Sequence, residues 1–264
     1  MNTIVRELRI IKSYIRLSYK NYIQFPLDFL MNFVMVLFDV IGVVLFWWSL
    51  AELNISLVGW TNEELLVFVG FSVFSEAVSK ILFGFRDLEY FILDGSFDKF
   101  LIRPINPIKT MLLEKLNIFA IVCKTILAIG IFLVVGFFTS LKLQNEWMAV
   151  LTLIAGTLAY ELLYGTFSLL AFWFGKIFYA RNLVFSFRSI RKYPLDIFSA
   201  PIKNIFTFII PLAFIATIPT NIILGRLQYP TIYFILSVVL LLIAYALFNY
   251  VLKRALAKYE STGS

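Results

Sequence analysis

The chain has no histidine and a single cysteine, Cys123, and charged residues make up only 15% of its 264 residues. These scarcities exclude a disulfide framework and a metal site built from histidine. The sequence also lacks a Gly-rich loop ending in Gly-Lys-Ser or Gly-Lys-Thr, the usual cradle for ATP phosphates. We therefore expect no catalytic residues, no metal, no bound cofactor and no nucleotide hydrolysis by this chain itself.

Hydrophobic residues make up 61% of the chain, well above the roughly 45–50% of an average soluble domain. A helix needs about 20 apolar residues to cross the hydrocarbon core of a membrane, and six stretches meet this length. They lie near residues 27–50, 65–85, 116–138, 147–174, 202–224 and 231–252. The sequence thus predicts an all-α integral membrane protein, with one transmembrane domain over residues 1–264.

The basic residues predict the orientation, because Lys and Arg in short loops favour the cytoplasmic side. Most of the 23 Lys and Arg lie before the first stretch, in residues 86–115, in residues 176–203 and after the sixth stretch. Of the other three connections, one has no basic residue, one has only Lys142 and one has only Arg226. Both termini should face the cytosol, and the net charge of +7 need not indicate nucleic acid.

Residues 1–24 combine basic residues with an apolar stripe at helical spacing. The stripe consists of Ile4, Leu8, Ile11, Ile15, Tyr19 and Tyr22. This pattern predicts a helix that lies in the membrane interface rather than a cleaved signal peptide. A solvated basic tail would explain the charges but not the stripe.

Ionisable residues inside the apolar stretches are costly unless they are paired or face a wet cavity. Five of them are candidates for an intramembrane polar site or a transport pathway: Asp39, Glu76, Lys80, Lys124 and Glu161. Glu76 and Lys80 are one helical turn apart and could neutralise each other. A proton relay built from such residues would make the chain a secondary transporter.

Residues 91–107, FILDGSFDKFLIRPINP, form a charged interruption between two apolar stretches. Asp94, Gly95 and Asp98 weakly resemble the paired aspartates of metal-dependent enzymes, so a membrane-embedded enzyme acting on lipid is an alternative. Large apolar residues in so short a loop would form an exposed patch unless they dock on membrane or protein. These residues are Phe91, Ile92, Phe97, Phe100, Leu101 and Ile102. Pro104 should end any helix at Arg103.

The fifth stretch carries Pro211 and Pro219 and is followed by Gly225. The prolines should break the hydrogen-bond ladder of a helix, and backbone freed in this way needs cover from protein or water. A kinked helix and a re-entrant element before the sixth stretch are both compatible with this pattern.

Three pieces of sequence carry a family resemblance over nearly the whole chain: LDGSFDKFLIRPINPI at 93–108, KYPLDIF at 192–198 and IIPLAFIATIPTNIILG at 209–225. With the amphipathic amino-terminal helix, they resemble the membrane subunit, or permease, of an ABC-2 type ABC transporter. The resemblance implies an elbow helix over 1–24 and a cytoplasmic coupling segment over 86–110. The residues that would couple to the ATPase are Phe91, Asp94, Gly95, Phe97, Asp98, Lys99, Phe100, Arg103 and Pro104.

The same resemblance implies partners and a location. Two copies of an ABC ATPase subunit would bind ATP and Mg²⁺ and supply the energy for export by alternating access. A second permease subunit, preferably a similar but distinct chain, would complete the pathway, although a homodimer is also compatible. The implied location is a prokaryotic plasma membrane, which the chain would cross several times.

Overall fold

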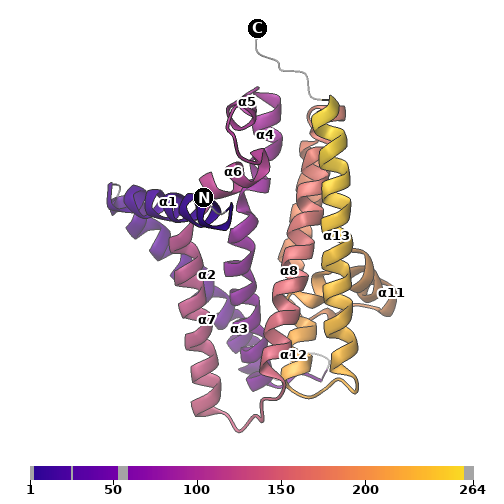
Figure 1. Ribbon diagram of the computed structural model, residues 1–264. Helices are drawn as coiled ribbons and strands as arrows, with labels where there is room; N and C mark the ends of the chain where they lie inside the picture. Colours follow the sequence, from indigo (N-terminus) through magenta and orange to yellow (C-terminus); the bar gives the residue numbers. More distant parts are fainter. Residues whose placement is uncertain (1–2, 25, 53–58, 259–264) are drawn as a thin grey trace.

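Long helices dominate the structure, a computed structural model that describes residues 3–24, 26–52 and 59–258. In this part of the chain every regular element is helical. α1 (Thr3–Gln24) lies crosswise to the long helices, near one end of the molecule (Figure 1). α2 (Pro26–Glu52) follows it, and α3 (Asn62–Ser79), α7 (Ile118–Phe138), α8 (Glu146–Leu169) and α13 (Pro230–Lys258) complete the set of long helices.

Local signals explain where the long helices begin. Thr61 and Glu64 form a capping box before α3, in which the Glu64 amide donates to the Thr61 hydroxyl and the Thr61 amide donates to the Glu64 carboxylate at 2.7 Å. The side-chain oxygen of Asn117 accepts from the Ala120 amide at 2.8 Å and so starts α7. Pro230 occupies the first position of α13, where its missing N–H costs nothing.

Four segments of the described chain are long and apolar enough to cross a membrane. They are Asn62–Leu93, Ile118–Phe138, Glu146–Phe174 and Pro230–Lys258, and they agree with four of the six predicted stretches. α2 covers the first predicted stretch but is not among the four. The number of spans therefore stays a prediction, whereas an all-helical membrane protein is confirmed.

The fifth predicted stretch is not one helix but a series of short helical pieces over residues 200–225, which we call the broken segment. α11 (Ala200–Asn204) continues into a π-helical turn, η3 (Ile205–Ile209), and then the backbone becomes extended at Ile210. η4 (Leu212–Phe214) and α12 (Thr217–Ile223) follow. Two further pieces precede them after α8, namely α10 (Phe178–Ile190) and η2 (Leu195–Ile197).

These pieces return the chain from one end of the molecule to the other. The return begins after α9 (Ala171–Phe174), which directly follows α8 and contacts one of the short helices after α3. At the finish, the Gln144 amide donates to the Ile223 carbonyl at 2.8 Å, and Arg226 donates to the Gly59 carbonyl at 2.9 Å. The finish is therefore at the opposite end, where α7 ends and α3 begins (Figure 1).

α8 is the central helix, because it contacts α3, α10, α12 and α13. Small residues let its neighbours approach closely. A Cβ atom built on Gly156 would lie 2.3 Å from the Cβ atom of Phe214, and one built on Gly165 would lie 2.9 Å from the ring of Phe85. The broken segment and the turn after α3, residues 80–86, thus pack directly on the α8 backbone.

Candidate functional site

The predicted coupling segment folds into a small helical unit, which we call the knob. It comprises η1 (Lys80–Arg86), α4 (Leu88–Leu93), α5 (Asp98–Leu101) and α6 (Pro107–Glu114), and it lies at the end of the molecule that also holds α1 (Figure 1). α5 ends at Leu101, and Arg103 and Pro104 follow in an irregular stretch. Asn106 then caps α6, since its side-chain oxygen accepts from the Lys109 amide at 3.1 Å.

A tight turn joins α4 to α5. Gly95 adopts a positive φ of 74°, which a residue with a side chain rarely reaches. The carboxylate of Asp94 accepts hydrogen bonds from the Ser96 amide at 3.0 Å and the Ser96 hydroxyl at 2.6 Å. Desolvation raises the pKa of Asp94, but hydrogen bonds from Ser96, from Tyr90 and from its own backbone together outweigh it, so the pKa lies below its ordinary value. The turn therefore carries a stable negative charge.

The aromatic residues of the segment point inward, which corrects the predicted exposed patch. Phe97 and Phe100 are fully buried, and Phe91 is 5% exposed. The rings of Phe91 and Phe100 are 5.3 Å apart, and the ring of Phe97 lies 5.6 Å from that of Phe172 on α9. Ile92 is buried as well. The patch is absent for these four residues because the turn folds α5 back onto α4 and α9 covers the rings.

A different set of apolar side chains faces outward from the knob, and we call it the knob face. Ile102 is 83% exposed, Tyr90 63%, Leu93 39% and Leu101 37%. Asp94 is exposed beside them. Ile102 and Leu101 were among the predicted anchors, whereas Tyr90 and Leu93 were not selected from the sequence. All five residues lie within thirteen positions around one turn.

Several basic side chains in the knob and directly after it are paired with carboxylates. Glu114 accepts from Lys99 at 2.9 Å and from Arg103 at 3.3 Å. Lys115 pairs with Asp87 at 2.8 Å. Asp98, the first residue of α5, is at the positive end of that short helix.

Arg103 and a further basic residue of the knob, Lys109, also connect the knob to α1. Arg103 donates to the hydroxyl of Tyr14 at 3.0 Å, and Lys109 forms an ion pair with Glu7. In addition, the Ser18 hydroxyl donates to the Leu116 carbonyl at 3.1 Å. Two polar contacts thus join α1 to the knob, and a third joins it to the residues directly after the knob.

A second polar site lies between the long helices, and we call it the charge cluster. Glu76 on α3 forms ion pairs with Lys124 on α7 and with Arg191 after α10, the latter at 2.5 Å. Lys124 and Arg191 are each 6% exposed. These contacts correct the expected pairing of Glu76 with Lys80, whose ammonium group instead lies 4.4 Å from the ring of Phe83. Residues distant in sequence supply better partners than the adjacent helical turn does.

Glu161 on α8 extends the charge cluster. It is 2% exposed, and its carboxylate lies 3.6 Å from the guanidinium group of Arg188 on α10. Arg188 also donates to the hydroxyl of Ser79 at the end of α3. The structure therefore brings together Glu76, Lys124 and Glu161 of the predicted intramembrane set. The side chain of Asp39 lies outside the described residues.

Sequence reasoning missed Arg188 and Arg191, which it counted among the cytoplasmic basic residues. Both are buried and reach into the protein from α10 and the turn after it. Their spacing of three residues places them on one side of a helical turn, and this was the available signal. No sequence pattern connects them with Glu76, which lies 115 positions before Arg191.

The three residues proposed as helix breaks occupy different positions in the broken segment. Pro211 follows the extended residue Ile210 and precedes η4. Pro219 is the third residue of α12, in the first turn, where a missing N–H is tolerated. Gly225 has a φ of 66° directly after Leu224, the C-cap of α12. The KYPLDIF piece is fastened nearby, since the Leu195 amide donates to the Thr217 hydroxyl at 3.1 Å and Asp196 accepts from the Trp60 indole at 3.2 Å.

Over residues 3–24, 26–52 and 59–258, no three His, Cys, Asp or Glu side chains are placed to hold a metal ion. A family model described as ABC-2 family transporter protein matches residues 4–263. The chain belongs to the ABC-2 transporter family. Searches of curated proteins and of solved structures found no match.

Membership of the ABC-2 family gives the two sites a context. The chain is a multi-pass membrane protein and a transporter permease subunit, and the family normally works with an ABC ATPase partner. An ABC-2 permease contributes transport rather than its own enzymatic chemistry. The knob, which joins α3 to α7, and the charge cluster between the long helices are therefore the two candidate functional regions.

Proposed function

We propose that this ABC-2 permease is the membrane subunit of an ATP-driven exporter, and that its knob face docks on a separate ATPase. The observation that carries this proposal is the exposure of Ile102, Leu101, Leu93 and Tyr90 above a buried aromatic base. Exposed apolar side chains on a rigid support are typical of a surface that a partner covers. Asp94, whose charge is stabilised by Ser96, would fix the orientation of the partner.

The proposed topology has six crossings and both termini in the cytosol of a prokaryotic cell. α2, α3, α7, α8 and α13 would each make one crossing, and the pieces between Phe178 and Ile223 would make another. The distribution of basic residues supports this orientation, because the knob end is rich in them and the opposite end holds few. α1 would then lie in the cytoplasmic interface as an elbow helix.

The knob is directly connected to the charge cluster along one stretch of chain. α3, which holds Glu76, continues through η1 into α4 without a long loop. Leu82 interrupts the helical geometry with φ −105° and ψ 21°, and this residue lies in η1, at the start of the knob. In the proposed mechanism, ATP and Mg²⁺ bind to two ATPase copies, their closure moves the knob and α1 together, and the kink at Leu82 transmits this motion to the spans.

The substrate would pass by alternating access between this chain and a second permease subunit. A similar but distinct chain is our preferred partner, and a homodimer is the other arrangement. Buried ion pairs that can exchange partners are suited to a protein with two conformations, which favours a pathway role for Glu76, Lys80, Lys124 and Glu161. Asp39 completes this proposed set.

Copurification with the ATPase tests the docking proposal. Ile102→Glu places a charge at the centre of the knob face, and we expect it to abolish copurification while the permease stays folded. Phe138→Glu is the matched control, because Phe138 is 81% exposed, ends α7 and lies at the opposite end of the molecule. Full retention of the ATPase by Ile102→Glu would overturn the assignment of the knob face.

A further inference from the structure

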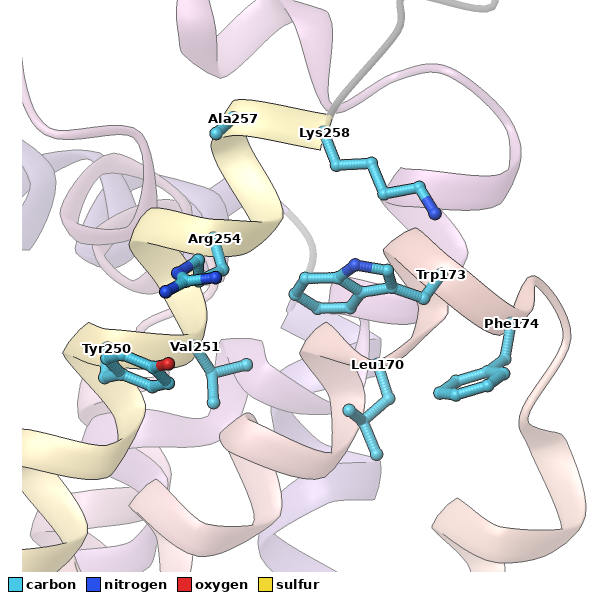
Figure 2. A pocket seen from close by; sticks show the side chains of 8 residues that line it. All are labelled: Leu170, Trp173, Phe174, Tyr250, Val251, Arg254, Ala257 and Lys258. Atoms are coloured by element: carbon cyan, nitrogen blue, oxygen red, sulfur yellow. The ribbon is translucent and has the colours of Figure 1, made fainter.

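A pocket of about 710 Å³ opens between the end of α8, α9 and the last turns of α13. Figure 2 shows the indole of Trp173 between the two helices, with the guanidinium group of Arg254 on the Tyr250 side and the Lys258 side chain extending toward the side of Phe174. The lining consists of Leu170, Trp173, Phe174, Tyr250, Val251, Arg254, Ala257 and Lys258. Aromatic and aliphatic side chains thus form most of the wall, and the only charges on it are positive.

The two cations of the pocket differ from those of the knob. Lys99, Lys109 and Lys115 each have a carboxylate partner. For Arg254 and Lys258, no carboxylate in the described part of the chain lies within ion-pair distance. Arg254 lies 5.2 Å from the ring of Tyr250, which orients its guanidinium group without neutralising it.

The pocket continues into a surface suited to hydrocarbon. Below it, α13 exposes one long apolar side, on which Leu242 is 61% exposed, Ile243 57% and Leu247 42%. Trp173 and Tyr250 lie where this apolar side meets the charged end of the helix. Such aromatic residues favour the boundary between the headgroups and the acyl chains of a membrane.

We propose that this pocket binds one anionic phospholipid. Arg254 and Lys258 are one helical turn apart on α13, and their exposed side chains would converge on the phosphate. The glycerol region would lie against Trp173, and an acyl chain would continue over Val251 and along α13. Basic pockets between helices at a membrane surface select anionic headgroups for this reason. The lipid site does not depend on ATPase docking, so it stands whether or not the exporter proposal does.

Charge complementarity favours a lipid over another protein as the occupant. A second permease copy or a peptide could cover the apolar wall, but it would also need an acidic side chain placed to reach both Arg254 and Lys258. An anionic phospholipid brings its charge and its apolar part already joined, in the order that the pocket presents them. It is also present at high local concentration around every spanning helix.

The test uses the full-length permease in detergent with added phosphatidylglycerol or phosphatidylcholine, and native mass spectrometry measures the retained lipid. We expect the wild type to bind phosphatidylglycerol more tightly. Arg254→Gln combined with Lys258→Gln should weaken that binding about 25-fold, at about fivefold per cation. Lys253→Gln is the control, because Lys253 is an exposed cation of the same helix that does not line the pocket.

Thermal unfolding of the wild type provides a second measurement that needs no variant. Phosphatidylglycerol should raise the unfolding temperature, whereas phosphatidylcholine and inorganic phosphate should leave it nearly unchanged. An equal rise with inorganic phosphate or with phosphatidylcholine would overturn the lipid site. So would an equal loss of binding in Lys253→Gln, since it would indicate general attraction to a basic helix end.

Discussion

Arg103 of the knob donates a hydrogen bond to the hydroxyl of Tyr14 on α1 at 3.0 Å. The two residues are 89 positions apart, yet this contact, together with the ion pair between Lys109 and Glu7, holds the crosswise helix against the knob. A force applied to the knob therefore reaches α1 at two points. Since α1 contacts both α2 and α7, the same force acts on the amino-terminal part of the helical bundle.

Tyr14→Phe removes the hydrogen bond from Arg103 while keeping the aromatic ring. We expect the free energy of unfolding to fall by about 1 kcal/mol, the usual net contribution of one hydrogen bond. Cleavage by a protease within residues 102–106 should become faster, because Arg103 loses a restraint. Tyr19→Phe is the control, since Tyr19 is an exposed residue of the same helix. Equal cleavage of the two variants would show that the bond to Tyr14 restrains nothing.

Phe97 lies in the interior of the knob and Ile102 lies on its surface, so their truncation should have different effects. Phe97→Ala should cost about 3–5 kcal/mol of local stability, as buried phenylalanine truncations do, because the ring is fully buried. Ile102→Ala should change stability by less than about 0.5 kcal/mol. Hydrogen exchange of the amides in α4 and α5 measures both effects.

The contrast between these two variants distinguishes the possible roles of the aromatic residues. If Phe97→Ala lost the ATPase without any increase in amide exchange, the ring would be a direct contact, as first predicted from the sequence. The structure favours the other result, in which exchange rises throughout α4 and α5 and the ATPase is lost as a consequence.

The sequence was sufficient to locate the knob but not to orient its side chains. A charged segment with Gly95 and Pro104 between two apolar stretches predicts a folded interruption of the bundle, and one is present. Which apolar residues are buried depends on α9, whose Phe172 lies against Phe97. That contact joins segments 75 positions apart, and no local pattern encodes it.

The ion pairs of the charge cluster also depend on long-range contacts that no local sequence pattern encodes. The high cost of burying an isolated charge correctly predicts that Glu76, Lys124 and Glu161 point into the protein. The i, i+4 spacing suggested Lys80 as the partner of Glu76, but α7 and the turn after α10 supply Lys124 and Arg191 instead. Whether Lys124 and Arg191 reach Glu76 depends on how the helices pack. α10 was not expected from the sequence, because its thirteen residues are too few to span a membrane.

Glu76→Gln tests the stabilising role of the charge cluster. Lys124 and Arg191 would both lose their carboxylate partner, and removing one member of a buried pair costs about 3–5 kcal/mol. A large fall in the unfolding temperature in detergent is therefore expected. Glu146→Gln, at the exposed start of α8, is the control and should have almost no effect.

Combining Glu76→Gln with Lys124→Gln should be less destabilising than the sum of the two single changes, because the double variant leaves fewer unpaired charges. Strict additivity would contradict a direct interaction between these residues. It would also remove the basis for assigning them a shared pathway role.

Gly156 provides a test of how the broken segment packs on α8. A methyl group added at this position would lie 2.3 Å from the Cβ atom of Phe214, and backbone atoms of Phe214 lie 3.0 Å away, so the side chain cannot simply rotate aside. Gly156→Ala should therefore destabilise the protein by about 1–3 kcal/mol through overpacking. Gly130→Ala on α7 meets nothing within 4 Å and should stabilise it by up to about 1 kcal/mol through helix propensity.

Phe214→Ala reveals whether the close approach itself causes the penalty. This change opens a cavity and should cost about 3–5 kcal/mol alone. However, Gly156→Ala added to it should cost much less than in the wild type, because the β-carbon clash can relax once the ring no longer anchors η4. Thermal unfolding of the four proteins gives the coupling between the two sites. A coupling near zero would mean that η4 does not rest on α8, and the return of the chain between Phe178 and Ile223 would then need another path.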